Sequence, residues 1–220
     1  MKYDIQDLHS LPYPQNEEIA NTLTHGMGII LSGLGLYLLF VEANQTGDPW
    51  KIWSSLIFGS CMIIGYSCST LYHASTNPKF KHQMRIADHI GIYLMIAGTY
   101  TPFVLVNLRG WIGWTFFILI WGCAFFGICL RIMNKHVPNY VSVGPYLFMG
   151  WLVIIGIKPL YDSLGSTGLT LVVLGGVFYS IGVGFYSSER IPFNHAIWHI
   201  FVLAGSISHY LAISLEVIPS

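Results

Sequence analysis

Two histidines near the C-terminal end of the sequence have a spacing that suits metal binding. His195 and His199 are four residues apart, so on a helix both rings lie on one face and can reach a common ion. The pair alone is equally compatible with two imidazoles that face lipid headgroups or water. Together with His73 from another part of the chain, it forms a three-histidine set, which is typical of catalytic zinc sites that keep a fourth position for water.

A carboxylate and a hydroxyl accompany these histidines. Asp88 is the acidic residue within a predicted span near the same plane, and an open zinc site requires a proton carrier. The sequence leaves a second role open for Asp88, in which it accepts a hydrogen bond from a ligand histidine and orients that ring. Ser69 lies one helical turn before His73 and is placed to hydrogen-bond Asp88 or the zinc-bound water, although taken alone it is more simply a serine bonded to its own helix.

The chain that must position these groups is unusually apolar. Of its 220 residues 54% are hydrophobic and 9% are charged, and the mean hydropathy is +0.59. Soluble domains are about 25% charged, so this composition excludes an ordinary soluble domain. Ten Lys and Arg balance ten Asp and Glu, so there is no basic excess to hold a nucleic-acid backbone. The composition predicts a membrane protein with no nucleic-acid partner.

Seven stretches are long enough to cross a bilayer, which requires about 20 apolar residues in a helix. They are continuously apolar rather than alternating, which favours helices over a β-barrel. We therefore expect an all-α, polytopic bundle of seven transmembrane helices in a single domain over residues 1–220, preceded by a cytoplasmic segment 1–23. The predicted spans are 24–43, 51–73, 86–107, 111–130, 140–160, 168–187 and 194–215.

The connecting segments predict the orientation, because cytoplasmic loops are enriched in Lys and Arg. With the N-terminus inside, the inner segments hold seven of the ten basic residues and the outer segments hold three. Trp50, Trp53, Trp111 and Trp114 then lie at the outer interface, where an indole keeps its ring in lipid and its N–H in water. We predict that the N-terminus is inside and the C-terminus is outside.

Ionisable side chains within spans are costly and mark candidate functional sites. Most of them fall at the predicted cytoplasmic ends of the spans. They are His25, His73, Asp88, His89, His195 and His199. His209 lies ten residues beyond His199, about 15 Å along a helix, and is too deep to share a site with it. His89 points about 100° away from its neighbour Asp88 and is left out of the ligand set.

Other residues predict local structure without a defined role. Glu18, Asn21 and His25 share one helical face, which we interpret either as a helix leading into the first span or as a lid over the site. Small residues at every fourth position predict close helix packing. They are Gly176, Ser180 and Gly184 in one span, and Gly28 and Ser32 in another.

The motifs taken together resemble the hemolysin III family. They comprise Ser69-Thr-Leu-Tyr-His73, then Asp88, then His195-Ala-Ile-Trp-His199, with EEIANTLTHGMG at 17–28, AGTYTPF at 97–103 and RIPFNHAIWH at 190–199. That family is the bacterial branch of the progestin and adipoQ receptors, in a superfamily shared with alkaline ceramidases. The resemblance covers nearly the full chain. It implies a seven-span bundle in which Zn²⁺ is held by His73, His195 and His199 near the cytoplasmic face, with Asp88 and Ser69 beside it as catalytic groups.

Three functions are compatible with these observations. The first is a zinc-dependent hydrolase of a lipid amide or ester, similar to a ceramidase, in the bacterial inner (plasma) membrane. The second is a non-enzymatic sensor or regulator of membrane homeostasis, in which zinc ties the second and seventh spans together. The third is the pore-forming cytolysin that the family name suggests, although no polar stripe is evident to line a channel. A membrane lipid is the expected substrate or ligand, and the oligomeric state is left open.

Overall fold

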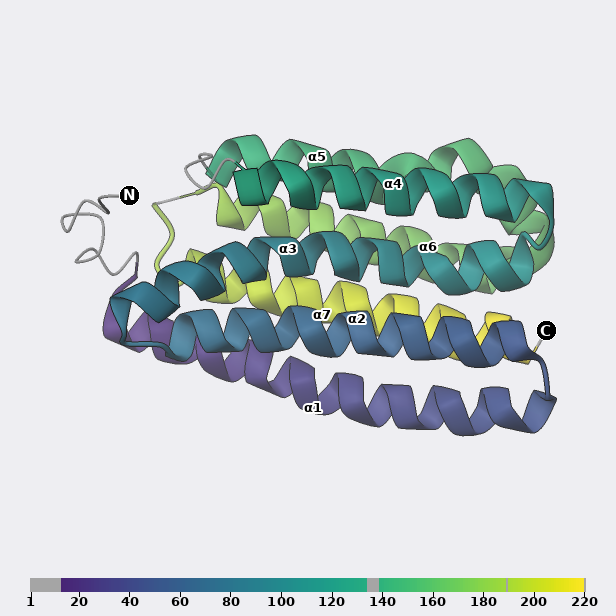
Figure 1. The fold of residues 1–220 in the computed structure, drawn as a ribbon, viewed down its shortest axis with the longest axis horizontal. Coiled ribbons are helices and arrows are strands. Elements are labelled where there is room, and N and C mark those ends of the chain that lie inside the picture. The colour runs from purple at the N-terminus through teal and green to yellow at the C-terminus, as the bar shows by residue number, and fades with distance from the viewer. Residues whose placement is uncertain (1–12, 134–138, 189, 220) are drawn as a thin grey trace.

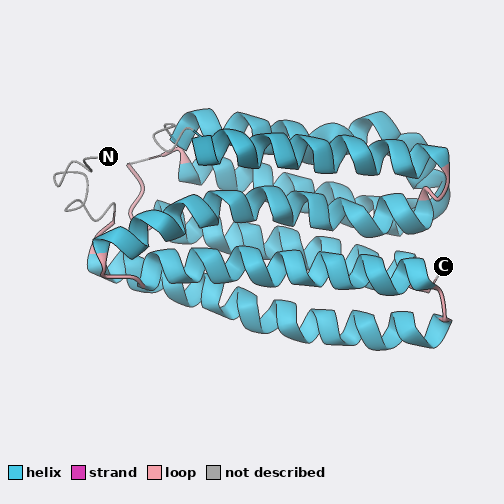
Figure 2. Ribbon diagram, viewed as in Figure 1, coloured by secondary structure: helices cyan, strands magenta, loops and turns pink. Residues whose placement is uncertain are grey.

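The computed structural model describes residues 13–133, 139–188 and 190–219. Within these residues the regular structure is entirely helical, with no β-strand (Figure 2). The elements are α1 (Gln15–Thr46), α2 (Pro49–Ala74), α3 (Pro78–Pro102), the π-helical η2 (Phe103–Asn107), α4 (Trp111–Met133), α5 (Asn139–Trp151), the 3₁₀-helical η3 (Leu152–Gly156), α6 (Ile157–Tyr186), α7 (Asn194–Ala212) and the π-helical η4 (Ile213–Val217).

The helices lie side by side along the long axis of the molecule (Figure 1). At one end of the bundle α1, α3 and α7 begin and α2 ends. We call this end, which holds His25, His73 and His195, the histidine end. We call the opposite end, which holds Trp50 and Trp114, the tryptophan end. Residues distant in sequence therefore meet at the histidine end.

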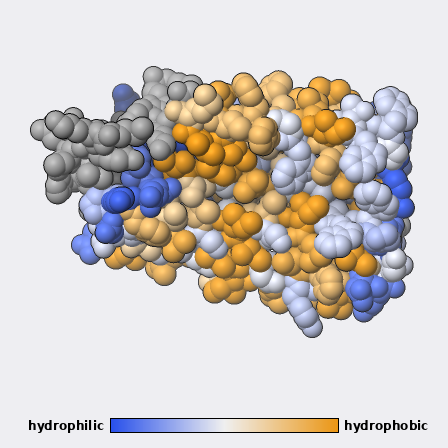
Figure 3. Space-filling model, in the orientation of Figure 1, coloured by the Kyte–Doolittle hydropathy of each residue, from blue (hydrophilic) through white to orange (hydrophobic). Residues whose placement is uncertain are grey.

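Large apolar side chains cover the flanks of the bundle. Leu23 is 67% exposed, Ile30 is 66% exposed and Phe125 is 70% exposed. In Figure 3 hydrophobic residues fill the central band of the visible face, and hydrophilic residues gather toward its two ends. Among the residues that the structure describes, six helical stretches are long and apolar enough to cross a membrane. Lipid is the solvent that such a surface requires, so the prediction of a polytopic membrane protein is confirmed.

Side-chain caps explain where two of the helices begin. The carboxylate of Asp48 accepts a hydrogen bond from the backbone N–H of Trp50 at 2.9 Å. Helix α2 starts directly after Asp48, at Pro49. The side chain of Asn77 accepts one from the N–H of Phe80 at 3.0 Å, and α3 also starts with a proline. A capping oxygen satisfies an N–H that has no partner inside the helix, and proline fits the first turn because it has no N–H.

Two helices extend beyond the apolar spans predicted from hydropathy. Helix α1 begins at Gln15 and α3 begins at Pro78, whereas the predicted spans begin at residues 24 and 86. The additional turns are polar and therefore invisible to an apolar window. In α1 they carry Glu18 and Asn21, so the helix leading into the first span is continuous with that span.

The stretch from Val143 to Tyr186 is 44 residues long. A straight helix of that length would measure about 66 Å, roughly twice the hydrocarbon thickness. The helical conformation is interrupted at Gly165, which has φ 67° and ψ −170°. In Figure 1 α5 and α6 run in opposite directions and the chain turns between them at the tryptophan end. The two predicted spans 140–160 and 168–187 lie on either side of Gly165.

Helices α1, α2 and α3 approach one another closely at glycines. A Cβ on Gly91 of α3 would lie 3.0 Å from the Cα of Gly65 on α2, so backbone faces backbone there. Gly28 of α1 packs against the ring of Tyr66, as the small-residue pattern predicted. The same expectation was wrong for Gly184, because no atom lies within 4 Å of the position of its Cβ. A repeat of small residues shows where approach is allowed, and the neighbouring helix decides whether it occurs.

The tryptophan end is held by aromatic and ionic contacts between two connections. Trp50 and Trp114 pack edge to face with their ring centroids 5.8 Å apart, so these two tryptophans lie at one end of the bundle, as predicted. Arg109 forms an ion pair with Asp48 beside them. This end lies far from the histidines, so it anchors the bundle without contributing to their site.

Candidate metal centre

Three buried imidazoles meet at the histidine end. His73 lies in the last turn of α2, and His195 and His199 lie in the first turns of α7. Their ring centroids are 4.9, 5.2 and 4.5 Å apart in pairs. One ligand atom from each ring can be chosen so that all three lie within 4.8 Å of one another. The three residues that the sequence singled out therefore form one cluster.

The start of α7 places the two histidines of that helix. Phe193 adopts a left-handed conformation with φ 56°, which is uncommon for a bulky residue and turns the chain sharply before the helix. The amide of Asn194 donates hydrogen bonds to the carbonyls of Tyr186 at 3.4 Å and Ser188 at 3.1 Å. These bonds tie the first residue of α7 to the end of α6. The four-residue spacing then brings His195 and His199 to the same face.

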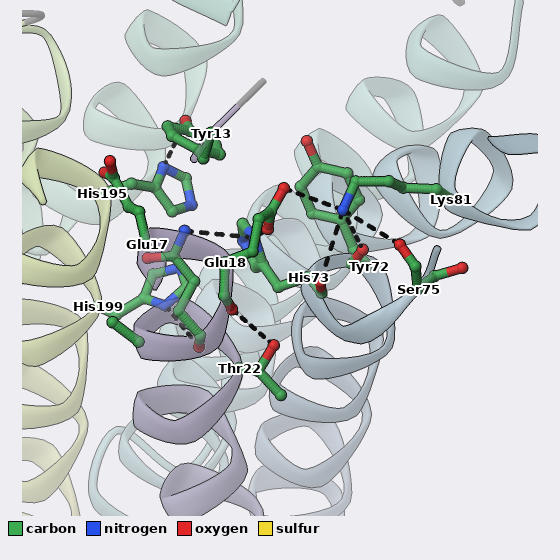
Figure 4. A network of polar contacts seen from close by, with 12 residues as sticks. Tyr13, Glu17, Glu18, Thr22, Tyr72, His73, Ser75, Lys81, His195 and His199 are labelled. Atoms are coloured by element: carbon green, nitrogen blue, oxygen red, sulfur yellow. Dashed lines mark hydrogen bonds and ion pairs between the residues drawn. The ribbon is translucent and has the colours of Figure 1, made fainter. Parts of the chain in front are cut away.

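Each ligand histidine has its Nδ1 beside an oxygen from residues 13–24 (Figure 4). The Nδ1 of His73 lies 2.6 Å from a carboxylate oxygen of Glu18. The Nδ1 of His195 lies 2.9 Å from the hydroxyl of Tyr13. The Nδ1 of His199 lies 3.1 Å from the hydroxyl of Thr24 and 3.2 Å from the backbone carbonyl of Asn21. Since each of these oxygens can accept a hydrogen bond, all three rings can carry their proton on Nδ1 and leave the Nε2 lone pair for a metal.

The hydroxyl of Tyr13 remains neutral beside His195. Burial raises the pKa of the Tyr13 phenol, and the nearby Tyr186 acts in the same direction. A protonated phenol oxygen still has lone pairs that accept the Nδ1–H of His195. Tyr13 therefore serves as a neutral acceptor.

The donor set fits a zinc ion. The Nε2 of His73 is buried and has no hydrogen-bond partner among the described residues, an arrangement that is costly unless a ligand satisfies it. Two nitrogens on one tetrahedral zinc ion lie about 3.4 Å apart, given Zn–N bonds of about 2.0–2.1 Å. The ligand atoms here lie within 4.8 Å of one another, so small ring movements suffice to close on the ion. Three imidazoles leave a fourth position open.

Asp88 and Ser69 lie on the walls of a cavity that also reaches His195 and His199. Ser69 is buried on α2, and its Oγ has no hydrogen-bond partner in the described part of the chain. It therefore does not bond Asp88 in this structure. Asp88 is half-buried on α3. The predicted catalytic pair thus lines the same cavity as two of the histidines, and its chemical role stays a prediction.

The cavity continues from this polar mouth into the apolar interior. It is bounded by α2, α3, α5, α6 and α7, and it reaches Leu108 and Phe116 near the tryptophan end. Along α3 and the first residue of η2 its lining runs from Arg85 to Phe103, which corresponds to about 27 Å of helix. That length approaches the hydrocarbon thickness of about 30 Å. An apolar chain attached to a polar group at the histidine end matches this shape.

The other histidines within the helices are placed differently. His25 stacks on His199 with ring centroids 3.4 Å apart, and neither of its nitrogens has a hydrogen-bond partner among the described residues. The Nδ1 of His89 donates to the carbonyl of Arg85 at 2.7 Å, and the Nε2 of His209 donates to the carbonyl of Val172 at 3.0 Å. Neither of these two belongs to the ligand group, as the sequence indicated.

The sequence missed the residues that hold the ligand rings. Glu18 and Asn21 carried a usable signal, because they share a helical face with His25 that points toward the site. Tyr13 precedes the first apolar stretch and gave no signal. Lys81, which pairs with Glu18 at 3.0 Å, lies in the first turn of α3, between the second and third predicted spans.

Comparisons with known proteins agree with this architecture. The family model described as Haemolysin-III related matches residues 13–210. Hemolysin-3 of Bacillus cereus is 44% identical over 204 residues, which cover 93% of each chain. The Hemolysin-3 homolog of Bacillus subtilis (strain 168) is 46% identical over 197 residues, which cover 90% of this chain and 92% of that one.

A human protein is related more distantly. The monocyte to macrophage differentiation factor of Homo sapiens is 29% identical over 204 residues, which cover 90% of this chain and 83% of that protein. The resemblance noted in the sequence is confirmed by matches that span nearly the whole chain. The chain is a multi-pass membrane protein and belongs to the Haemolysin-III related family.

Proposed function

We propose that this protein is a zinc-dependent hydrolase that cleaves an amide or ester bond of a membrane lipid. The observation that carries the proposal is the cluster of His73, His195 and His199 at the mouth of an apolar cavity. Three convergent imidazoles with an open fourth position are typical of catalytic rather than structural zinc. A cavity that is polar at one end and apolar along its length suits a lipid.

We further propose that the chain crosses the inner (plasma) membrane of a bacterium seven times, with its N-terminus inside and its C-terminus outside. The interruption at Gly165 supports counting the 44-residue stretch as two crossings. The excess of Lys and Arg in the segments at the histidine end supports the orientation. The bacterial relatives and the helical architecture support the choice of membrane, since continuously apolar helices are the usual spanning elements there.

Each polar residue has a role in this reaction. His73, His195 and His199 would hold zinc, which when bound lowers the pKa of water and polarises a carbonyl. Hydrolysis adds the water oxygen to the acyl carbon and breaks the bond to the leaving nitrogen or oxygen. Asp88 accepts the proton of the water and delivers it to the leaving atom, so atoms and charge balance. Ser69, with its free Oγ, orients the polar group of the lipid.

The cavity gives this site its substrate class. The scissile bond lies beside the histidines, and the acyl chain extends along α3 toward Phe103. The acyl chain moves from the hydrocarbon of the bilayer into an apolar cavity, so it is not exposed to water when the lipid binds.

The direct test is product release from a panel of lipid amides and esters by the purified, zinc-loaded chain. We expect turnover that a chelator abolishes and that the variant Asp88→Asn lowers by about 10²–10⁴-fold, the usual contribution of a general acid or base. Glu42→Gln, far away at the other end of α1, removes one carboxylate and serves as the control. No release of product from any lipid of the panel by the zinc-loaded form contradicts the proposal.

The alternative role is a non-enzymatic sensor or regulator, in which zinc ties α2 to α7. It is favoured by the position of the ligands, because His73 and His199 join two helices that begin at opposite ends of the bundle. In that case His73→Ala lowers thermal stability, whereas Asp88→Asn leaves the cellular phenotype intact. Conductance in planar bilayers that persists in the double variant His195→Ala, His199→Ala would instead favour a pore.

A further inference from the structure

We propose that Glu18 is a positioning residue of the metal centre, which holds the ring of His73 so that its Nε2 faces the ion. This inference rests on the proposed metal centre, but not on the hydrolysis. It concerns a part of the chain whose role the sequence left open. The proposal assigns the first turns of α1 to the site rather than to the membrane surface alone.

The contact between Glu18 and His73 is the strongest of the three that hold the ligand rings. The carboxylate Oε2 lies 2.6 Å from Nδ1, with the His73 side chain fully buried and that of Glu18 9% exposed. The amide nitrogen of Asn21 lies 3.4 Å from the same Nδ1. The shorter, charge-assisted contact prevails, since such hydrogen bonds are about twice as strong as neutral ones. Nδ1 therefore donates its hydrogen to Glu18, and the lone pair resides on Nε2.

Lys81 makes a buried carboxylate tolerable at this position. Its Nζ lies 3.0 Å from the Oε1 of Glu18, donates to the carbonyl of Tyr72 at 3.1 Å and sits 4.9 Å from the centre of the Tyr72 ring. The two oxygens of Glu18 thus have separate partners, one on α2 and one on α3. A buried carboxylate without such a cation would be costly or would take up a proton.

This arrangement is difficult to explain by stability alone. A buried ion pair is weak evidence for stability, because apolar residues of similar volume often stabilise a protein as well or better. Contact with the Nδ1 of a metal ligand gives the pair a function. A carboxylate in that position fixes the tautomer and orientation of the ring and makes it a stronger ligand. The corresponding partners Tyr13 and Asn21 are neutral, so His73 is the most strongly polarised of the three ligands.

The proposal is tested by metal affinity in the full-length chain purified in detergent. Zinc affinity is measured by competition with a chelator for Glu18→Gln and Glu18→Leu, with Glu42→Gln as the matched loss of a carboxylate from the same helix. Loss of such a partner typically weakens metal binding by about 10–100-fold. We expect Glu18→Leu to show the full loss, Glu18→Gln a smaller one because its amide oxygen still accepts a hydrogen bond, and Glu42→Gln none.

A second measurement separates positioning from a merely structural role. The midpoint of thermal unfolding of the metal-free chain should be unchanged or raised in the double variant Glu18→Leu, Lys81→Met, which replaces both charges of the buried pair by apolar side chains. The visible absorption spectrum of the chain loaded with Co²⁺ in place of zinc should change in Glu18→Gln but not in Glu42→Gln, because the ligand field depends on how the His73 ring is held. If Glu18→Leu does not fold, the isosteric Glu18→Gln carries the test.

The possible outcomes are distinct. Wild-type affinity and an unchanged Co²⁺ spectrum in the Glu18 variants overturn the positioning role. A metal-free double variant Glu18→Leu, Lys81→Met that is destabilised in proportion to its loss of metal also overturns it. If the wild type binds zinc and the variants lose affinity as expected, yet no lipid is cleaved, then the proposed hydrolase activity is wrong and the role of Glu18 still stands. A wild type that binds neither zinc nor Co²⁺ removes both.

Discussion

The layer formed by α1, α2 and α3 and the cavity side of α5 and α6 pack in different ways. In the layer, Gly65 and Gly91 bring two backbones together and Gly28 receives the ring of Tyr66. Helix α6 packs closely on α7, where a Cβ on Gly175 would lie 2.5 Å from the His209 ring, but the side of α5 and α6 that lines the apolar cavity has room. The layer is filled to contact, and the cavity side of α5 and α6 is not.

This difference matches the demands on each part. The layer carries His73 together with Glu18 and Lys81, whose contacts hold the orientation of the His73 ring. A displacement of a few tenths of an ångström there would alter those contacts. The α5 and α6 side borders the cavity, where a ligand must enter and be accommodated. Close packing thus accompanies the groups that need fixed geometry, and looser packing accompanies the space that must accept a guest.

The largest effect is expected from filling the closest approach in the layer. Gly91→Val places a branched side chain 3.0 Å from the Cα of Gly65, where no flexible side chain can yield. Overpacking costs about 1–3 kcal/mol when neighbours can relax, and more when they cannot. We expect a marked loss of folded protein, measured as the thermal midpoint in detergent. Gly184→Val, with nothing within 4 Å, should remain near wild type; a similar loss in both variants would refute the contrast.

A smaller and more selective effect is expected on the open side. Gly176 lines the cavity, and a Cβ there meets the Trp151 ring at an ordinary distance of 3.4 Å. Gly176→Leu should leave folding and zinc affinity intact but weaken binding of a lipid with a fluorescent acyl chain about tenfold, or about 1.4 kcal/mol. The control Gly184→Leu, outside the cavity lining, should bind like wild type. Equal lipid binding by both variants would mean that the acyl chain does not occupy the cavity beside Gly176.

The smallest effect is expected where the two parts are joined. The hydroxyl of Tyr66 on α2 donates to Ser206 of α7 at 2.7 Å, and the hydroxyl of Tyr179 on α6 lies 3.0 Å from the same oxygen. Ser206→Ala should cost about 0.6–1.7 kcal/mol of stability, the range measured for hydrogen bonds between membrane helices. Equilibrium unfolding in mixed detergent checks this value. In a protein that already carries Ser206→Ala, Tyr66→Phe should lower the stability only slightly, because the hydrogen bond between the two residues is already lost. If the stability losses of the two single variants simply add up in the double variant, the two residues do not share this bond.

The sequence was most informative where the relevant pattern is local. The spacing of His195 and His199 predicted a shared face, and the apolar stretches predicted helices that cross a membrane. The position of His73 near that pair was predicted from the order of the spans, because the second span ends on the side of the membrane where the seventh begins. These predictions depend only on the helical rise of about 1.5 Å per residue and on the thickness of the bilayer, which are the same for every sequence.

The contacts between distant segments were beyond such reasoning. Glu18 and His73 are 55 positions apart, and nothing in either local sequence indicates that they meet. Tyr13 reaches His195 across 182 positions from outside any apolar stretch. The approach of Gly65 to Gly91 depends on how α2 and α3 rotate about their axes, which a repeat of small residues does not determine. The full length of α1 and α3 was also beyond such reasoning, because polar turns extend these helices beyond their hydrophobic segments.

The three histidines of the candidate metal centre come from distant parts of the polypeptide. His73 emerges early in synthesis, and His195 and His199 emerge only when the last helix has been made. No partly inserted chain can therefore capture the ion with all three rings. Metal capture would mark the completion of membrane integration, and a chain cut short before α7 would be left without a functional centre.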